Sequence, residues 1–331
     1  MSYGDIDLNG KTVLVTGAAG FIGANLAAHI ERHYPDATVV ALDGFQLGHF
    51  RNLDGFRGQF IAGDIASPAA LQRLSDFRFD CIFHQAAISD TRVADQARMI
   101  EVNTNAFRSL LDLAVEHGST VVYASSAAVY GSDTAPNRVG EGEQPETVYG
   151  FSKLMMEQAA RHYAPRLRGR IAGLRYFNVY GPGEHFKSNT ASMILQLGLQ
   201  AIASGEAKLF KHGEQRRDFV YVEDVVQANL LCLAVDRPSV FNVGSGDARP
   251  FNDIVAGLRQ TLGISIDVQY IDNPHRVYQT HTEADIEPIQ SALGYTPRFR
   301  LEQGIEAYGP EIARIAAEQG HGDRRSQPVA A

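Results

Sequence analysis

The sequence predicts an α/β fold in which a doubly wound parallel sheet carries helices on both faces, with a smaller α/β lobe interleaved. Three observations support this prediction. Short runs rich in Val, Ile and Leu alternate with longer stretches whose apolar residues recur at helical spacing. A glycine-rich turn joins the first such run to the first helical stretch. Small or polar residues follow successive strand ends, the edge at which an open parallel sheet binds its ligands.

Composition and charge exclude several classes of function. The chain has 331 residues, of which 44% are hydrophobic and 21% charged, enough for a large core. A formal net charge of −8 argues against a nucleic-acid partner. No apolar run is long enough to span a bilayer, and the first eleven residues lack a signal peptide's apolar core, so we expect a cytoplasmic protein without a membrane partner. Cys81 and Cys232 lie in apolar segments and are expected in the core; we expect no metal site.

The first strand and helix are joined by a turn typical of dinucleotide binding. Thr12–Thr16 has the β-branched, apolar pattern of a buried strand, and Phe21–His33 has helical periodicity. Between them, glycines at 17, 20 and 23 permit a tight turn and let backbone N–H groups approach a pyrophosphate at the helix N-terminus. We therefore expect a Rossmann-type domain whose contacts with a dinucleotide include Gly17, Gly20, Phe21, Ile22 and Gly23.

The second strand, Thr38–Leu42, ends in a carboxylate. Asp43 can accept hydrogen bonds from both hydroxyls of an adenosine ribose and would repel a 2′-phosphate. This favours NAD as cofactor, while His49 and Arg51 lie close enough in sequence to leave NADP open. The alternative for Asp43 is a turn residue at the end of a strand with no ligand.

Strands and helices continue to alternate up to residue 174. We expect strands at Gln59–Ala62, Cys81–Gln85, Thr120–Ala124 and Arg170–Leu174, and helices at Pro68–Leu74, at Asp95–Glu116 and from Tyr149 to about Tyr163. Residues after the strand ends should share one rim of the sheet. They include Asp64 and Ile65 near an adenine, Ala86 and Ala87 against the cofactor, Ser126, and Asn178.

Beyond residue 178 the elements become shorter. We expect a helix at Ala191–Ile202 and a strand at Lys208–Phe210, whereas Val222–Val235 and Val240–Val243 should return to the main sheet. The predicted division is a dinucleotide-binding domain of residues 1–178, with return segments at about 220–244, and a substrate lobe of residues 179–219 and 245–318. Residues 319–331, rich in Gly, Arg, Ser and Pro, are expected to be disordered.

Tyr149 and Lys153 would lie one turn apart on the same helix face. An ammonium beside a phenol favours the phenolate, so we expect the pKa of Tyr149 to fall towards working pH. Such a tyrosine can exchange a proton with an alcohol or a carbonyl. A Tyr-x-x-x-Lys pair alone is usually part of an ordinary surface helix. Its combination with the upstream dinucleotide turn and Ser126 favours the chemical interpretation.

The sequence resembles the extended short-chain dehydrogenase/reductase superfamily, in particular its nucleotide-sugar epimerases and dehydratases. The residues that carry this resemblance are glycines 17, 20 and 23, Ser126, and the Tyr149–Lys153 pair. The resemblance extends over residues 12–308. It implies that Tyr149 is the acid/base, that Lys153 lowers its pKa and holds the nicotinamide ribose, and that Ser126 hydrogen-bonds the reacting oxygen. Ser125 is then structural, although the two serines could be assigned the other way round.

Finer features favour epimerisation over elimination of water. Sugar dehydratases of the superfamily carry an Asp-Glu pair where this chain has Ala127-Ala128. Other stretches are most similar to the family of ADP-L-glycero-D-manno-heptose 6-epimerases, which implies a role in lipopolysaccharide or surface-carbohydrate biosynthesis and a homo-oligomer. That family usually has Thr-Thr-Glu at residues 91–93, where this chain has Thr-Arg-Val, and this leaves the exact sugar and nucleotide open. The matching stretches are Ser89 to Asn103, Arg175 to Pro182, Lys187 with Ala191-Ser192, Lys208 to Phe210, Arg217 to Val222, and Tyr278 to Asp285.

The same resemblance implies further site residues. It places Asn103 at the cofactor, Ser89, Ser126, Asn178 and Tyr278 at the substrate, Arg217 at its diphosphate, and Lys187 as a second acid/base. Each has an alternative: Lys187 as a phosphate or solvent contact, Arg217 in a salt bridge with Asp218 or Glu223, and Asn178 or Tyr278 as a buried polar group.

The expected reaction is epimerisation of a nucleotide-diphosphate sugar by transient oxidation. Tyr149 removes a hydroxyl proton, the nicotinamide oxidises the carbon, the ketone turns, and reduction occurs on its other face. The alternatives are a 4-epimerase or 4-reductase acting on a UDP- or GDP-sugar, and a non-catalytic NAD-binding scaffold. Intact Ser126, Tyr149 and Lys153 argue against the scaffold, whereas the fold alone does not decide.

Overall fold

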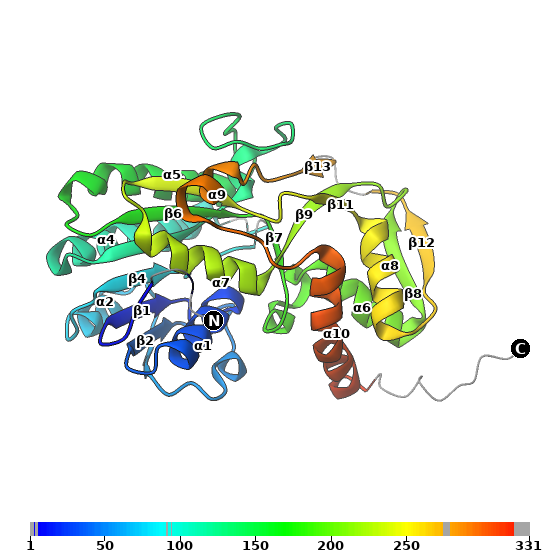
Figure 1. Cartoon of the computed structure of the whole chain (residues 1–331), viewed down its shortest axis with the longest axis horizontal. Coiled ribbons are helices and arrows are strands. Elements are labelled where there is room, and N and C mark those ends of the chain that lie inside the picture. Colours follow the sequence, from blue (N-terminus) through cyan, green and yellow to red (C-terminus); the bar gives the residue numbers. More distant parts are fainter. Residues whose placement is uncertain (1–2, 4–5, 91, 94, 274–278, 321–331) are drawn as a thin grey trace, which may run out of the picture.

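Seven parallel strands form the central sheet of the protein (Figure 1), seen in a computed structural model that describes residues 3, 6–90, 92–93, 95–273 and 279–320. Their order is β10-β6-β5-β4-β1-β2-β3, so the chain winds in opposite directions from β1 and β4. This confirms the predicted doubly wound sheet and places its switch point between those two strands. The strands are β1 (Thr12–Thr16), β2 (Thr38–Asp43), β3 (Gln59–Ala62), β4 (Cys81–His84), β5 (Thr120–Ser126), β6 (Ile171–Tyr176) and β10 (Ser239–Val243).

Helices cover both faces because successive strand residues point to opposite sides. Val13 and Val15 of β1 belong to the core shared with α1 (Phe21–His33) and α7 (Val222–Leu231). Leu14, between them, belongs to the core shared with helices on the other face. These are α2 (Pro68–Leu74), α4 (Ala106–His117) and α5 (Val148–Tyr163).

Two expectations about this region were wrong. The single helix expected at Asp95–Glu116 is interrupted: α3 (Gln96–Ile100) is followed by a π-helical turn (Glu101–Asn105) before α4 begins. This turn directs Thr104 Oγ1 onto the carbonyl oxygen of Ser152 in α5, at 3.2 Å. The stretch expected to rejoin the sheet from Val222 forms α7 and a 3₁₀ turn (Cys232–Ala234), so only the later segment enters it, as β10.

The rest of the chain builds a smaller α/β lobe beside the central sheet (Figure 1). Ile194, Leu258 and Ile305 belong to its separate core. One small sheet contains β7 (Asn178–Tyr180), β9 (Arg216–Tyr221), β11 (Ala248–Pro250) and β13 (His281–Thr282), and another pairs β8 (Glu206–Phe210) with β12 (Asp267–Ile271). The helices are α6 (Met193–Ser204), α8 (Phe251–Leu262), α9 (Glu287–Leu293) and α10 (Leu301–Glu318), and 3₁₀ turns lie at Phe50–Leu53, Ala127–Tyr130, Ala164–Arg166 and His185–Thr190.

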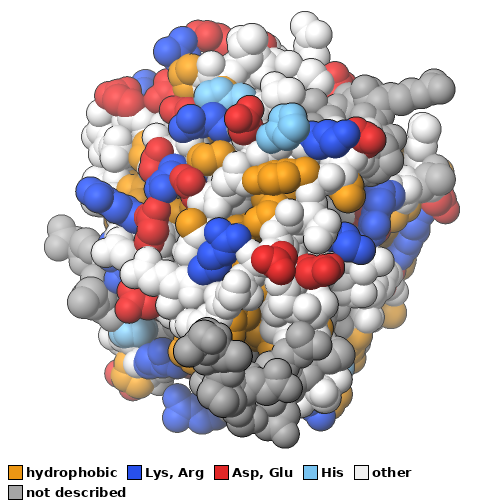
Figure 2. Space-filling model, turned by 90° about the vertical axis from the view of Figure 1, so that its right-hand side faces the viewer, with side chains coloured by type: hydrophobic (Ala, Val, Ile, Leu, Met, Phe, Trp, Pro, Cys, Tyr) orange, Lys and Arg blue, Asp and Glu red, His pale blue; other side chains and the backbone are white. Residues whose placement is uncertain are grey.

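Charged side chains of both signs are interspersed with small apolar patches on the face that Figure 2 shows. Within the described part of the chain, no helix is both long and apolar enough to cross a bilayer. The division into a dinucleotide-binding domain and a substrate lobe is a proposal, supported by the separate sheets. Residues 321–331 of the predicted disordered tail, and Tyr278, lie outside the described residues.

Candidate active site

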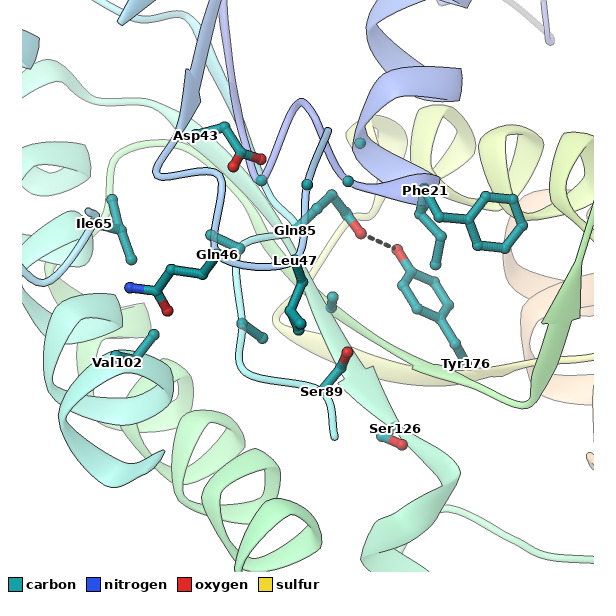
Figure 3. Close-up of a pocket in the computed structure, with 18 of the residues that line it drawn as sticks. Phe21, Asp43, Gln46, Leu47, Ile65, Gln85, Ser89, Val102, Ser126 and Tyr176 are labelled. Carbon is teal, nitrogen blue, oxygen red and sulfur yellow. Dashed lines mark hydrogen bonds between the residues drawn. The ribbon is translucent and has the colours of Figure 1, made fainter. Parts of the chain in front are cut away.

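A cavity of about 300 Å³ opens at the carboxyl ends of the central strands (Figure 3). It lies where the winding direction changes, the position at which doubly wound sheets bind their ligands. Most of the predicted site residues line it: Gly17, Gly20, Phe21, Ile22, Gly23, Asp43, Asp64, Ile65, Ala86, Ala87, Ser89, Ser126, Tyr149, Lys153 and Lys187. Segments 170 residues apart in sequence therefore meet around one space.

The glycine turn (residues 17–23) fits a dinucleotide by its shape. Gly17 has a φ of +66°, and a Cβ there would lie 2.6 Å from the backbone nitrogen of Ala86. A Cβ on Gly23 would lie 2.2 Å from the Gly17 carbonyl oxygen, so neither position admits a side chain. No side chain caps the N-terminus of α1, which leaves backbone N–H groups directed at the cavity edge. Such a crowded, uncapped turn suits a pyrophosphate.

Asp43 is held at the end of β2 by backbone donors. Its Oδ2 accepts a hydrogen bond from the Ala19 nitrogen at 2.9 Å, and its Oδ1 accepts one from the Phe45 nitrogen at 2.7 Å. Burial raises the pKa of Asp43, and these N–H groups oppose the rise. Each carboxylate oxygen retains acceptor capacity towards the cavity, as a ribose contact would require.

The adenine end of the predicted site contains residues that the sequence interpretation missed. Asp64 Oδ2 accepts a hydrogen bond from Gln46 Nε2 at 3.2 Å and forms an ion pair with Arg98. In Figure 3, the Gln46 side chain lies between Ile65 and Val102. Gln46, Leu47 and Gly48 line the cavity from the loop after Asp43. Their position directly after a predicted strand end was the signal that could have indicated them.

Tyr149 and Lys153 face the cavity from the first two turns of α5. Thr147 caps this helix by accepting a hydrogen bond from the Gly150 nitrogen at 3.1 Å. The ammonium nitrogen of Lys153 lies 5.8 Å from the centroid of the Tyr149 ring. Ser126, at the end of β5, also lines the cavity, and its hydroxyl accepts a hydrogen bond from the Ala128 nitrogen at 3.1 Å. The three side chains predicted to act together are therefore assembled by one helix and one strand.

The expected fall in the pKa of Tyr149 was wrong for this structure. Burial raises the pKa of Tyr149, and the nearby Ser126 hydroxyl only opposes that rise. Burial also lowers the pKa of Lys153 to about 7. The physical reason is that both groups are poorly solvated, while the hydrogen bond of Lys153 goes to the Ala124 carbonyl at 2.8 Å.

Ser125 is committed to a buried ion-pair network. Its hydroxyl donates to Glu157 Oε1 at 2.6 Å. Arg175 donates to both oxygens of the same carboxylate, from Nε at 2.8 Å and from Nη2 at 2.7 Å. Glu157 lies one turn beyond Lys153 on α5, so this network fixes the helix against β5 and β6. The arrangement supports the structural assignment of Ser125.

Lys187 reaches the cavity from a different element, the loop of residues 181–190. Its ammonium nitrogen lies 5.5 Å from the centroid of the Phe21 ring. Burial lowers the pKa of Lys187, and the nearby Glu184 opposes this shift. A lysine whose pKa is lowered can exchange a proton closer to neutral pH.

Three predicted residues do not line the cavity. Asn103 is fully buried, where its Oδ1 accepts from the Ile88 nitrogen at 2.8 Å and its Nδ2 donates to Ser152 Oγ at 2.9 Å. Its amide therefore supports the strand-end loop, and its assignment to the cofactor stays a prediction. Asn178 donates from Nδ2 to the Asp218 carbonyl at 3.2 Å. Arg217 lies on the adjacent strand β9 and donates to the Arg216 carbonyl at 2.9 Å.

The alternative ion pairs proposed for Arg217 involve carboxylates with other partners. Asp218 accepts hydrogen bonds from the backbone nitrogens of Ser245, Gly246 and Ala284. Glu223 pairs with Arg298 at 3.2 Å. The assignment of Arg217 to the diphosphate therefore stays a prediction.

Gln85 and Tyr176 form a further part of the cavity that sequence reasoning missed. The Tyr176 hydroxyl donates to Gln85 Oε1 at 3.1 Å, the dashed line in Figure 3. Asn229 of α7 donates to the Tyr176 hydroxyl at 2.9 Å and accepts from Gln85 Nε2 at 3.0 Å. Gln85 follows β4 and Tyr176 ends β6, so the strand-end rule was again the available signal.

A dinucleotide cradle beside a Ser–Tyr–Lys set defines a nicotinamide-dependent enzyme of the Rossmann type. The chain belongs to the NAD dependent epimerase/dehydratase family, whose sequence model matches residues 13–244. Its cofactor is NAD, in agreement with the prediction from Asp43.

Solved structures of nucleotide-sugar epimerases resemble the chain over nearly its whole length. The ADP-L-glycero-D-manno-heptose-6-epimerase of Helicobacter pylori is 49% identical, with a TM-score of 0.90, 94% of this chain covered and 99% of that one. The UDP-glucose 4-epimerase of Thermotoga maritima, with UDP-glucose, is 27% identical, with a TM-score of 0.83 and coverages of 92% and 99%. The UDP-glucuronic acid 4-epimerase of Bacillus cereus, with UDP-glucuronic acid and NAD, is 26% identical, with a TM-score of 0.80 and coverages of 92% and 99%.

Proposed function

We propose that the protein is an ADP-L-glycero-D-manno-heptose 6-epimerase that inverts one sugar carbon through a transient ketone. The observation that carries this proposal is the 49% identity, over almost the full length of both chains, with the Helicobacter pylori enzyme of that name. The cavity supports epimerisation because Tyr149 and Lys187, two groups able to exchange protons, enter it from separate elements.

The glycine turn would hold NAD, with Asp43 at the adenosine ribose and Lys153 at the nicotinamide ribose. When bound, NAD supplies a reversible two-electron oxidation of the sugar alcohol. Tyr149 accepts the proton of the reacting hydroxyl, and Ser126 donates a hydrogen bond to the same oxygen. Burial raises the pKa of Tyr149, which favours the protonated phenol once the proton has been accepted, and the same proton returns to the oxygen when the ketone is reduced again.

Lys187 acts as the acid/base on the second face of the ketone. Its position on the 181–190 loop, and not on α5, lets the sugar turn between two fixed proton-exchanging groups. The buried Glu184 carboxylate nearby limits the fall in the pKa of Lys187. Ser89 contacts the substrate, Asn178 and Tyr278 position its sugar or its diphosphate, and Arg217 binds the diphosphate.

The test is a panel of purified ADP-, GDP- and UDP-sugars, including both C6 epimers of ADP-glycero-manno-heptose, with products resolved by NMR. We expect interconversion of the two heptose epimers without net change in NAD. Inversion at C4 of a UDP- or GDP-sugar instead would support the 4-epimerase alternative. NAD binding without turnover of any sugar would support the scaffold alternative.

The proposal includes the setting of the reaction. The substrate partner is a nucleotide-diphosphate sugar, the compartment is the cytoplasm, and the protein assembles as a homo-oligomer. The free thiols of Cys81 and Cys232, both buried, are compatible with a reducing compartment. Size-exclusion chromatography with light scattering tests the oligomeric state.

A further inference from the structure

Two asparagines join the loop that carries Lys187 to the cofactor-binding turn. Asn25 of α1 donates from Nδ2 to the Pro182 carbonyl at 2.9 Å and to the Phe21 carbonyl at 2.9 Å. Asn52 donates from Nδ2 to the Gly183 carbonyl at 3.1 Å and to the Ala19 carbonyl at 3.0 Å. Each amide therefore bridges one carbonyl of residues 19–21 and one carbonyl of the Lys187 loop (residues 181–190).

Two ring contacts also join the Lys187 loop to the cofactor-binding turn and the chain after it. Phe186, next to Lys187, stacks on His49 with centroids 3.7 Å apart and ring planes at 7°. The His49 nitrogen donates to the Ala19 carbonyl at 3.0 Å, the carbonyl that Asn52 also binds. Lys187 itself lies over the Phe21 ring. The segment from Pro182 to Lys187 thus rests on residues of the cofactor-binding turn and of the chain just after it.

The loop needs such external support. Ser188, directly after Lys187, has a φ of +51°, a conformation that a residue with a side chain adopts only when its surroundings impose it. A separate cavity of about 430 Å³, lined by Asn25, Asn52, Gly183 and Phe186, lies against the loop. The Asn25 and Asn52 amides, which bridge the loop and the cofactor-binding turn, border this open cavity.

Glu184, next to Gly183 in the loop, is attached to the smaller lobe. The buried Glu184 carboxylate accepts hydrogen bonds from the Ser192 nitrogen at 2.5 Å and from the Ser192 hydroxyl at 2.7 Å, at the start of α6. The Lys187 nitrogen donates to the Glu184 carbonyl at 2.9 Å. The anchored residues Pro182, Gly183 and Glu184 are thus consecutive and directly precede the turn that carries Lys187.

We propose that Asn25 and Asn52 are positioning residues that hold Lys187 at the cavity and couple its placement to the occupancy of the cofactor turn. Both amides bind carbonyls of residues that a pyrophosphate would order, so a bound dinucleotide stiffens the acceptors of the bridges and, through them, the loop. This inference rests on the proposed role of Lys187 in the reaction.

The first test compares Asn25→Ala/Asn52→Ala with wild type and with Asn105→Ala, a control in which an exposed amide bound to Glu101 is removed. We expect the double variant to lower kcat by roughly 10- to 100-fold with KM within about threefold, because loss of alignment affects the chemical step. In a Lys187→Met background the same two substitutions should change kcat by less than about twofold, since coupled sites are not additive. An unchanged kcat, or an equal loss in both backgrounds, would overturn the proposal.

The second test does not depend on turnover. Trypsin cleaves after Lys187 only when the loop leaves the cavity, and mass spectrometry identifies that cut. We expect the double variant to be cut at least several-fold faster than wild type and Asn105→Ala, and added NAD to slow the cut in wild type but not in the double variant. Equal rates in all three proteins, or equal protection by NAD, would contradict the coupling. A wild type that converts no ADP-heptose refutes the proposed function and leaves this second test intact.

Discussion

The ammonium of Lys153 lies 5.8 Å from the Tyr149 ring centroid and donates its hydrogen bond to the Ala124 carbonyl of β5, at 2.8 Å. The lysine is thus fixed to the sheet beneath the tyrosine. Burial lowers the pKa of Lys153 to about 7 and raises that of Tyr149. Burial thus disfavours both the phenolate form of Tyr149 and the ammonium form of Lys153, and each effect can be measured.

Lys153 should make stability depend on pH. Its folded-state pKa of about 7 is below its ordinary value of 10.5, so the unfolded chain binds more protons between these values. Stability therefore rises with pH across this window, and the penalty for burying the ammonium is complete below pH 7. Lys153→Met removes this term. We expect the melting temperature of the variant, relative to wild type, to be higher at pH 6.5 than at pH 9.5, as followed by circular dichroism. If the melting temperatures of the two proteins change with pH in parallel, folding does not lower the pKa of Lys153.

Tyr149→Phe should separate chemistry from binding. The substitution removes only the proton-carrying oxygen, so we expect the fold and NAD content to be retained. Turnover should fall by about 10²–10⁴-fold, the usual contribution of a general acid/base. Tyr163→Phe, at the other end of α5, is the matched control and should remain within a few-fold of wild type. If Tyr149→Phe is also within a few-fold, the proton transfer takes place at another residue.

Asp43→Asn should weaken NAD binding and reduce discrimination against NADP. The carboxylate is buried, and its backbone donors fix it at the cavity edge. Charged hydrogen bonds of this kind contribute roughly 1.5–3 kcal/mol, so we expect NAD affinity to fall about tenfold or more. The nucleotide released on denaturing wild type should be NAD, because the cycle needs no exchange of cofactor. Titration with NAD and with NADP measures the two affinities, and chromatography of the released nucleotide identifies the bound cofactor. Release of NADP alone would refute the argument from Asp43.

Arg217 and Lys187 should differ in kinetic effect when each is changed to Met. Arg217 is expected to bind the diphosphate in the ground state and in the transition state alike. Arg217→Met should therefore raise KM more than it lowers kcat. Lys187 is expected to act as an acid/base in the chemical step. Lys187→Met should therefore lower kcat with little change in KM, and kcat should fall more in one direction of inversion than in the other. Both constants are measured with the same nucleotide sugar in both directions. A KM effect alone for Lys187→Met would make it a binding residue, and Tyr149 would then serve both faces of the ketone.

Local sequence was enough to predict the framework of the site. The β-branched run at Thr12–Thr16 and the glycines after it are patterns within one short stretch of sequence, and β1 and α1 have the predicted bounds. The spacing of Tyr149 and Lys153 gives one helix face wherever that helix packs. Strand-end residues meet at one rim because all strands of a parallel sheet point the same way.

Tertiary structure decided what the sequence pattern left open. Asn103 faces the protein interior, whereas Gln85 and Tyr176 face the cavity, because contacts across the sheet determine these orientations. The sign of the pKa shift at Tyr149 depends on how much solvent the folded chain removes, a quantity absent from a local motif. The placement of Lys187 depends on a hydrogen bond between Asn52 and Gly183, which are 131 residues apart. Spacing along the chain determines helix faces and strand ends, but burial and long-range hydrogen bonds exist only once distant segments have packed together.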